Sequence, residues 1–212
     1  VLGGSTEIIR EVMSHCPDSS KTDLLFKINH SGASTFLSAI GEESPVELLN
    51  ELLEMCPEEK REDYFMQVNI QGRTCLMLAA EKCDTEVLVF LLGECPGESR
   101  VDFLLKTDDN GLTVLEYAIQ RGDSENFRIL LSSLPAQHRE RLCDGEDSTG
   151  YKCLTYAMER RKGASLLAIL DFCKVPEEML IKALSFSTEI LNYEHLQNAI
   201  LSHVKNVFVK KV

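Results

Sequence analysis

The strongest constraint in this 212-residue sequence is a pattern of glycine, threonine, leucine and alanine that recurs at nearly constant spacing. The copy GLTVLEYA begins at Gly111, and GRTCLMLA begins 39 residues earlier, at Gly72. A further copy, GASTFLSA, begins at Gly32, and GYKCLTYA begins at Gly150, with Lys152 in the threonine position. A regular period of this length indicates a repeat protein, in which each unit buries its apolar face against its neighbours.

A second apolar stretch follows each copy and predicts a longer helix. In VELLNELLEMCP, Leu49, Leu52 and Leu53 have the spacing of one helix face. The corresponding residues in the other copies are Leu88, Leu91 and Leu92; Phe127, Leu130 and Leu131; and Leu166, Ile169 and Leu170. Each glycine suits a turn with positive φ, and the residue that follows it by two positions is a natural helix N-cap, namely Ser34, Thr74 or Thr113. Each unit is therefore predicted to be a turn, a short helix, a tight turn and a longer helix, with the tight turn at Asp84 or at Gly122 and Asp123.

The pattern G-x-T-x-L-x-x-A, followed by V-L-x-x-L-L, resembles the ankyrin repeat, and the resemblance covers residues 29 to about 175. The sequence departs from the family in having CLM, VLE or CLT in place of the usual Pro-Leu-His. Each unit is also about six residues longer than the usual 33 or so. The extra residues lie in PEEKREDYFMQ, PGESRVDFLLK and PAQHRERLCDG, which we interpret as a short third helical turn that packs its apolar side on the stack. TPR and HEAT arrays also pair helices at similar periods, but neither explains a glycine turn before the first helix.

The resemblance implies an all-α, ankyrin-like helical repeat solenoid with a C-terminal helical cap. We expect four repeats, at 29–68, 69–107, 108–146 and 147–185. Residues 1–28 are expected to form a partial repeat, since Cys16 and Pro17 match Cys56 and Pro57; its second helix begins at Thr6, with Gly4 at the preceding turn. On this interpretation the chain is a fragment of a longer protein. Residues 186–212 are expected to form the cap, with Ser187 as its N-cap.

Composition argues against several classes of function. A net charge of −12 disfavours general binding to nucleic acid or to anionic membranes. No apolar run approaches the roughly 20 residues needed to span a bilayer, and the first residues, VLGGSTEIIR, lack the features of a signal peptide. The eight cysteines include no CxxC pair. We interpret them as reduced thiols and predict a cytoplasmic location, in the producing cell or in a host cell.

The cysteines do not predict a metal or catalytic site. Four of them occupy one equivalent position in different repeats: Cys16, Cys56, Cys95 and Cys173. Neighbouring members are at least one repeat apart, or roughly 8–10 Å, which is too far for a disulfide or a zinc site. Leu134 fills the same position in the third repeat, so the position is simply apolar. Cys143 lies near His138, but it matches the apolar positions of Phe65 and Leu104, and no base or oxyanion site is implied. We predict no catalytic, cofactor-binding or metal-binding residue, and therefore no enzyme.

The family resemblance implies that a partner protein binds along the concave side, at the tips of the turns and the outward face of the first helix. The candidate partner-binding residues are Ile70, Gln71, Arg73, Lys82, Asn110, Leu112, Gln120, Arg121, Thr149, Tyr151 and Arg160. Leu112 and Tyr151 are expected to project from adjacent turns, although sideways packing between the turns is an open alternative. Arg121, Arg160, Arg161 and Lys162 form a positive patch on an acidic protein. The patch favours an acidic segment of a partner, with a merely solvated face as the alternative. Leu112 and Tyr151, together with Ile70 and Arg73, would form a mixed apolar and basic strip that favours a mixed apolar segment.

These features together predict a non-catalytic scaffold for protein–protein interaction. We expect no cofactor, nucleic acid, membrane or small-molecule substrate. The alternative is a targeting or regulatory ankyrin module of a larger multidomain protein, for example a secreted bacterial effector with a catalytic domain upstream.

Overall fold

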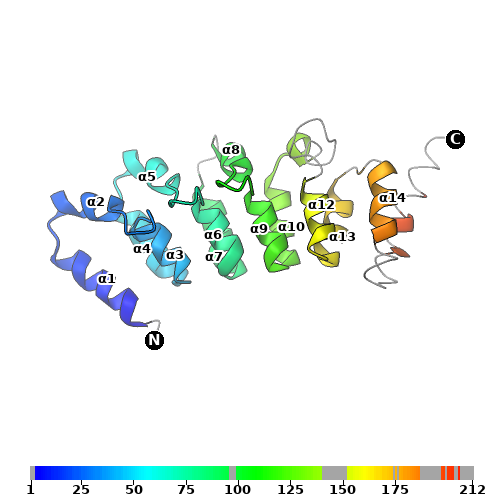
Figure 1. Ribbon diagram of the computed structural model, residues 1–212. Coiled ribbons are helices and arrows are strands. Elements are labelled where there is room, and N and C mark those ends of the chain that lie inside the picture. The colour runs from blue at the N-terminus through cyan, green and yellow to red at the C-terminus, as the bar shows by residue number, and fades with distance from the viewer. Residues whose placement is uncertain are drawn as a thin grey trace. The chain divides into compact units, whose positions relative to one another are not determined.

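The computed structural model describes residues 3–95, 99–139, 152–173, 175, 177–186, 197–198, 200–202 and 205. Within them every regular element is a helix, and the predicted all-α class of ankyrin-like helical repeats is confirmed (Figure 1). The chain divides into two compact units, unit 1 at residues 1–114 and unit 2 at residues 115–212. The proposed cap at 186–212 lies almost entirely outside the described residues, and its N-cap residue Ser187 lies outside them as well.

Unit 1 consists of helices that pack side by side in pairs. Its helices are α1 (Gly3–His15), α2 (Asp18–Phe26), α3 (Thr35–Gly41), α4 (Val46–Glu54), α5 (Glu58–Phe65), α6 (Cys75–Lys82), α7 (Thr85–Glu94) and α8 (Arg100–Leu105). The short helices α3 and α6 pack on each other, and each packs on the longer helix that follows it, α4 or α7. The core of the unit is therefore built between successive pairs as well as within them.

Unit 2 repeats the same arrangement. Its described helices are α9 (Val114–Arg121), α10 (Ser124–Ser133), α12 (Lys152–Glu159), α13 (Gly163–Phe172) and α14 (Glu177–Phe186). The longer helix α13 packs both on α12 and on the preceding longer helix α10. Leu130 and Ile169, which the sequence assigns to one helix face, are both buried.

Side-chain caps explain where several helices begin. Ser34 Oγ accepts a hydrogen bond from the Leu37 N–H at 3.5 Å, and Thr74 Oγ1 accepts one from the Met77 N–H at 3.3 Å. Both predicted N-caps are confirmed. Asp123 plays this role for α10, with its carboxylate accepting from the second and third N–H groups of the helix. A cap of this kind stabilises a helix by about 1 kcal/mol because it pairs an N–H group that has no partner within the helix.

The extra segments form the predicted third helical turn. They are α5 and α8, and their apolar residues Tyr64, Phe65, Phe103 and Leu104 are buried. The rings of Phe65 and Phe103 are 5.2 Å apart, so the two extra helices contact each other from adjacent repeats. Most of the third extra segment, including Cys143, lies outside the described residues.

Each of these extra helices also carries an arginine, Arg61 in α5 and Arg100 in α8, that binds a carbonyl at the end of the preceding longer helix. Arg61 Nε donates to the Cys56 carbonyl at 3.4 Å, and Arg100 Nη2 donates to the Cys95 carbonyl at 3.3 Å. Carbonyls at the C-terminal end of a helix have no partner within it, and a cation there also suits the helix dipole. The basic position that recurs in the sequence therefore has a structural role.

One local prediction is wrong. Gly4 was expected at a turn before the first helix, but α1 begins at Gly3 and includes it. The expectation came from aligning Cys16 with Cys56, which places Gly4 where Ser44 precedes α4. Glycine is tolerated in α1 because its weak helix propensity matters least in the first turn, where the N–H groups have no partner within the helix in any case.

Candidate partner-binding surface

The turns before the short helices are held by one recurring asparagine or aspartate. We call the turns at 29–33, 69–73 and 108–112 the first, second and third fingers. In the second finger, Asn69 Oδ1 accepts hydrogen bonds from the N–H groups of Gln71 and Arg73, both at 3.0 Å. The equivalent bonds are made by Asn29, to Ser31 and Ala33, and by Asp108, to Asn110 and Leu112. Sequence reasoning missed this role, although an Asn or Asp three residues before each finger glycine was a visible signal.

The finger glycines allow two fingers to approach closely. Gly32 and Gly72 have φ of 69° and 72°, a region that residues with a Cβ rarely adopt. A Cβ on Gly32 would lie only 2.9 Å from the backbone nitrogen of Ile70 in the next finger. That nitrogen donates a hydrogen bond to the Ser31 carbonyl at 3.0 Å. The fingers are thus joined backbone to backbone, and the Asp109 N–H makes the same bond, at 3.1 Å, to Gln71 of the second finger.

A groove lies between the first two fingers and the helices α3 and α6, with a volume of about 260 Å³. Most of its lining is polar, with amide and hydroxyl groups from Asn29, Ser31, Ser38, Asn69 and Gln71. Its charged residues are Glu42, Arg73 and Lys82, and its small or apolar ones are Ala33, Leu37, Gly41 and Leu78. We call this set of residues the finger groove. Such a lining suits hydrogen bonding to a polar segment.

The two cations of the finger groove are held in different ways. Arg73 Nη1 lies 2.9 Å from Glu81 Oε2, in an ion pair that is only partly exposed. Lys82 Nζ donates to the Gly41 carbonyl at 3.2 Å, at the C-terminal end of α3, and remains exposed. Glu81 therefore neutralises Arg73, whereas Lys82 presents its charge to solvent across from Glu42.

The structure brings some of the candidate residues together and separates others. Gln71, Arg73 and Lys82 line the finger groove, and Ile70 is 69% exposed on the second finger. Asn110 and Leu112 lie on the third finger, where Leu112 is half-buried. Gln120, Arg121 and Arg160 lie in unit 2, whereas Thr149 and Tyr151 are outside the described residues. The groove residues Ser38 and Leu78 were missed, because they become neighbours of the fingers only when α3 and α6 pack together; Asn29 was missed together with the role of its side chain in the first finger.

Burial makes the described cysteines other than Cys16 poor candidates for reactive thiols. None forms a disulfide, and all except Cys16 are buried. Burial raises the pKa of the Cys56, Cys75 and Cys95 thiols above the ordinary value. The thiolate is the nucleophilic form, so these groups are poor nucleophiles at neutral pH. Among the described residues, no group of His, Cys, Asp or Glu side chains is placed to hold a metal ion.

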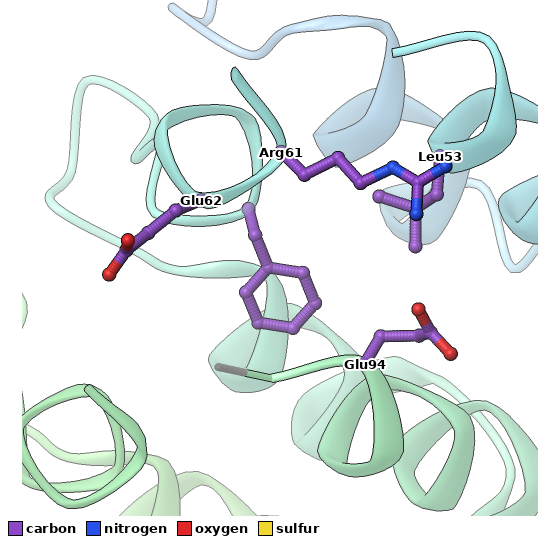
Figure 2. A pocket seen from close by; sticks show the side chains of 5 residues that line it. Leu53, Arg61, Glu62 and Glu94 are labelled. Carbon is purple, nitrogen blue, oxygen red and sulfur yellow. The ribbon is translucent and has the colours of Figure 1, made fainter. Parts of the chain in front are cut away.

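A second hollow, near the ends of α4 and α7, is too small for a substrate. Figure 2 shows it lined by Leu53, Arg61, Glu62, Glu94 and the ring of Phe65. Its volume of about 30 Å³ is room for about one water molecule. Separately, no helix in the described part of the chain is both long and apolar enough to cross a membrane.

Paired helices, fingers joined by backbone hydrogen bonds and an inter-repeat core define a helical-repeat protein. Residues 1–141 match the protein-family model described as ankyrin repeats in three copies. Since the match covers 141 of the 212 residues, the chain belongs to the ankyrin-repeat family. Ankyrin repeats are generally protein–protein interaction modules and are typically non-catalytic. A comparison with curated proteins found no match.

Proposed function

We propose that the chain binds a partner protein through the finger groove and the adjoining finger tips of unit 1. The observation that carries the proposal is the groove itself, which brings together Gln71, Arg73 and Lys82 from two elements. These three belong to positions that the repeat pattern leaves free to vary. The exposed side chains of Gln71 and Lys82 can contact a partner directly, and Arg73, which is paired with Glu81, adds to the polar wall of the groove.

The chemistry of the surface supports a polar segment with one apolar anchor. The amide and hydroxyl groups of the groove can pair with the backbone and polar side chains of a partner. Ile70, exposed beside the groove, supplies an apolar contact at the centre of the surface. A stable protein interface buries about 800 Å² on each side. The partner would therefore also cover the third finger, with Asn110 and Leu112.

The test compares two surfaces of unit 1 in a crosslinking pull-down from cytosol. The groove variant carries Ile70→Asp and Lys82→Glu. The control variant carries Val89→Asp and Lys60→Glu, which make the same chemical changes at exposed residues of α7 and α5. We expect the groove variant to recover at least about tenfold less of the partner than the control does, since central apolar anchors dominate binding energy.

As a control, circular dichroism melting of both variants tests whether each of them is folded. Equal recovery by the two folded variants would reject the finger groove as the binding surface.

A further inference from the structure

A cluster of basic side chains lies where α9 and α12 end, in unit 2. It consists of Arg121, Arg160, Arg161 and Lys162, and we call it the basic cluster. The two helix ends are side by side. Tyr156 Oη is 3.2 Å from Gln120 Oε1, and the Lys162 side chain crosses Gly122 so closely that a Cβ there would lie 2.9 Å from Nζ. Cations from two repeats are therefore gathered on one surface.

Three of these cations have no ion-pair partner among the residues that the structure describes: Arg160, Arg161 and Lys162. This is unexpected in a chain with 34 acidic and 22 basic residues. Elsewhere, Arg10 is paired with Glu51 at 2.7 Å and Arg128 with Asp171 at 3.0 Å. Within the described part of the chain, the charges of these three side chains are thus available to an external anion.

The arginine next to the end of α12 is positioned by an aromatic ring. Arg160 Cζ lies 5.1 Å from the centre of the Tyr156 ring, which holds the guanidinium over a flat apolar surface. Glu159 is exposed beside it and is the acidic residue at this end of α12. At the neighbouring helix end, the Asp123 carboxylate is already engaged by N–H groups of α10. Among the residues that the structure describes, the local balance of charge is therefore positive.

The backbone at Arg161 is in a conformation that normally selects glycine. Its φ is 57°, its N–H donates to the Met158 carbonyl, and the Lys162 N–H donates to the Ala157 carbonyl. This is the helix-ending motif whose left-handed residue is usually glycine. Gly122 occupies the equivalent position after α9, with φ of 84°. The side chain of Arg161 is exposed. The chain thus carries an exposed cation at a turn position where the preceding repeat has glycine.

We propose that the basic cluster binds an acidic segment of a partner protein, as a second recognition surface beyond the finger groove. A short acidic segment fits better than a long polyanion. At physiological salt, charges interact strongly only within about 8–10 Å. A few carboxylates bound at the basic cluster therefore interact mainly with its cations and little with acidic residues elsewhere on the protein. A longer nucleic acid would also place phosphates near the rest of the protein, which repels them because its net charge is −12.

The probe is a fluorescein-labelled peptide of twelve alternating Glu and Gly residues, and its Gln counterpart is the control. Binding to the 212-residue chain is followed by fluorescence anisotropy at low salt and at 300 mM NaCl. We expect the Glu peptide to bind at least about tenfold more tightly than the Gln peptide, and to weaken at least about fivefold at the higher salt concentration. Equal binding of the two peptides would overturn the proposal.

Two pairs of variants separate recognition from net charge and from folding. The double variant Arg160→Glu and Arg161→Glu is expected to bind the Glu peptide at least about tenfold more weakly. The control, Lys27→Glu and Lys60→Glu, makes the same change of net charge at exposed residues of unit 1 and should keep full binding. Equal loss in both variants would mean that only net charge matters, and would overturn the site.

Arg161→Gly removes the positive charge of the side chain and also the strain of positive φ, because glycine adopts this backbone conformation readily. It is expected to raise the melting temperature and to weaken peptide binding about threefold or more. Glu43→Gly is its match, because Glu43 has the same φ of 57° after α3 in unit 1; it should raise the melting temperature with binding unchanged. Unweakened binding by Arg161→Gly would contradict the proposal. Tighter binding of a twelve-nucleotide single-stranded DNA than of the Glu peptide would also contradict it.

The finger-groove variant Ile70→Asp, Lys82→Glu should bind the acidic peptide normally, so the two surfaces can fail independently. Loss of peptide binding in this variant would overturn the assignment to the basic cluster.

Discussion

The longer helices of the two units differ at one equivalent core position, which is apolar in unit 1 and polar in unit 2. In unit 1 this position holds Leu48 on α4 and Val87 on α7, and both are buried among apolar neighbours. In unit 2 it holds Asn126 on α10 and Ser165 on α13, both with no exposed surface. Within the described residues, neither the Asn126 amide group nor the Ser165 hydroxyl group has a hydrogen-bond partner. A buried polar group without a partner costs about 1–3 kcal/mol.

The comparison shows that repeats with the same backbone can differ in stability. The helices α10 and α13 pack on each other, and each carries one buried polar side chain without a partner. Stability in a repeat protein is approximately a sum over neighbouring units. The joint between α10 and α13 should therefore open before the joint between α4 and α7.

The largest effect is expected from placing the polar residue of unit 2 into unit 1. Leu48→Asn should lower the free energy of unfolding by about 3 kcal/mol, because it loses apolar burial and introduces an unpaired amide. Urea denaturation followed by circular dichroism measures the change. Leu48→Ala is the matched variant that only shortens the side chain. If both variants have the same stability, the unpaired amide is not a penalty, and the comparison fails.

A smaller effect is expected at two glycines with positive φ, one in each unit. Gly72→Ala should lower the free energy of unfolding by about 2 kcal/mol, because the left-handed backbone is strained and the new Cβ would meet the Asp109 backbone nitrogen at 3.1 Å. Gly122→Ala should cost only about 1 kcal/mol, since its nearest neighbour is the flexible end of Lys162. Thermal melting of both variants measures which one loses more stability. A larger loss in Gly122→Ala would show that the contact of Gly122 with Lys162 is less adaptable than the contact of Gly72 with Asp109.

The converse substitution in unit 2 should be stabilising. Asn126→Val introduces the residue that α7 carries at the same position and removes two unpaired polar atoms. We expect a gain of about 1 kcal/mol, and slower hydrogen exchange in α13, which packs against α10. Ser165→Ala should give a gain in the same direction. A loss of stability in both variants would show that the polar groups are satisfied, for example by a buried water molecule.

The smallest effect is expected in thiol labelling, which reports local opening. Cys95 and Cys173 end the longer helices α7 and α13, and both are buried. Burial raises the pKa of Cys95, so the thiolate is scarce in the folded state at pH 8 and labelling there requires opening. If unit 2 opens more easily, Cys173 should react with iodoacetamide about threefold to fivefold faster than Cys95 in the native protein. Mass spectrometry of the labelled peptides measures the ratio, and a faster reaction at Cys95 would contradict the ranking of the two units.

Features carried by a few neighbouring residues could be predicted from the sequence. The N-caps Ser34 and Thr74 were recognisable because a cap needs only its own side chain and the next helical turn. The helix α5 was recognisable from the repeated apolar positions of the extra segments. Gly4 was misplaced because an alignment of equivalent residues does not show where a helix actually begins. The role of Asn69 was readable in its spacing from Gly72, but it was overlooked.

The candidate surface could be predicted only in part. Gln71, Arg73 and Lys82, predicted as partner-binding residues, do line one groove, since their places in the repeat put them on one side of the second finger and α6. Ser38 could not be selected in this way, because its contact with the groove depends on how α3 lies against α6. The grouping of Arg160 with Tyr156 likewise follows from side-chain conformation, which spacing alone does not determine.

The sequence by itself determined the repeat, the all-α class and the family, because these depend on apolar spacing and turn chemistry that recur within each unit. Only the tertiary structure decided which side chains meet across repeats. The finger groove and the basic cluster arise between elements of different repeats, and the lack of partners at Asn126 and Ser165 is visible only in the folded chain. Packing between repeats is set by side-chain shape and hydrogen-bond geometry, and a one-dimensional pattern contains neither.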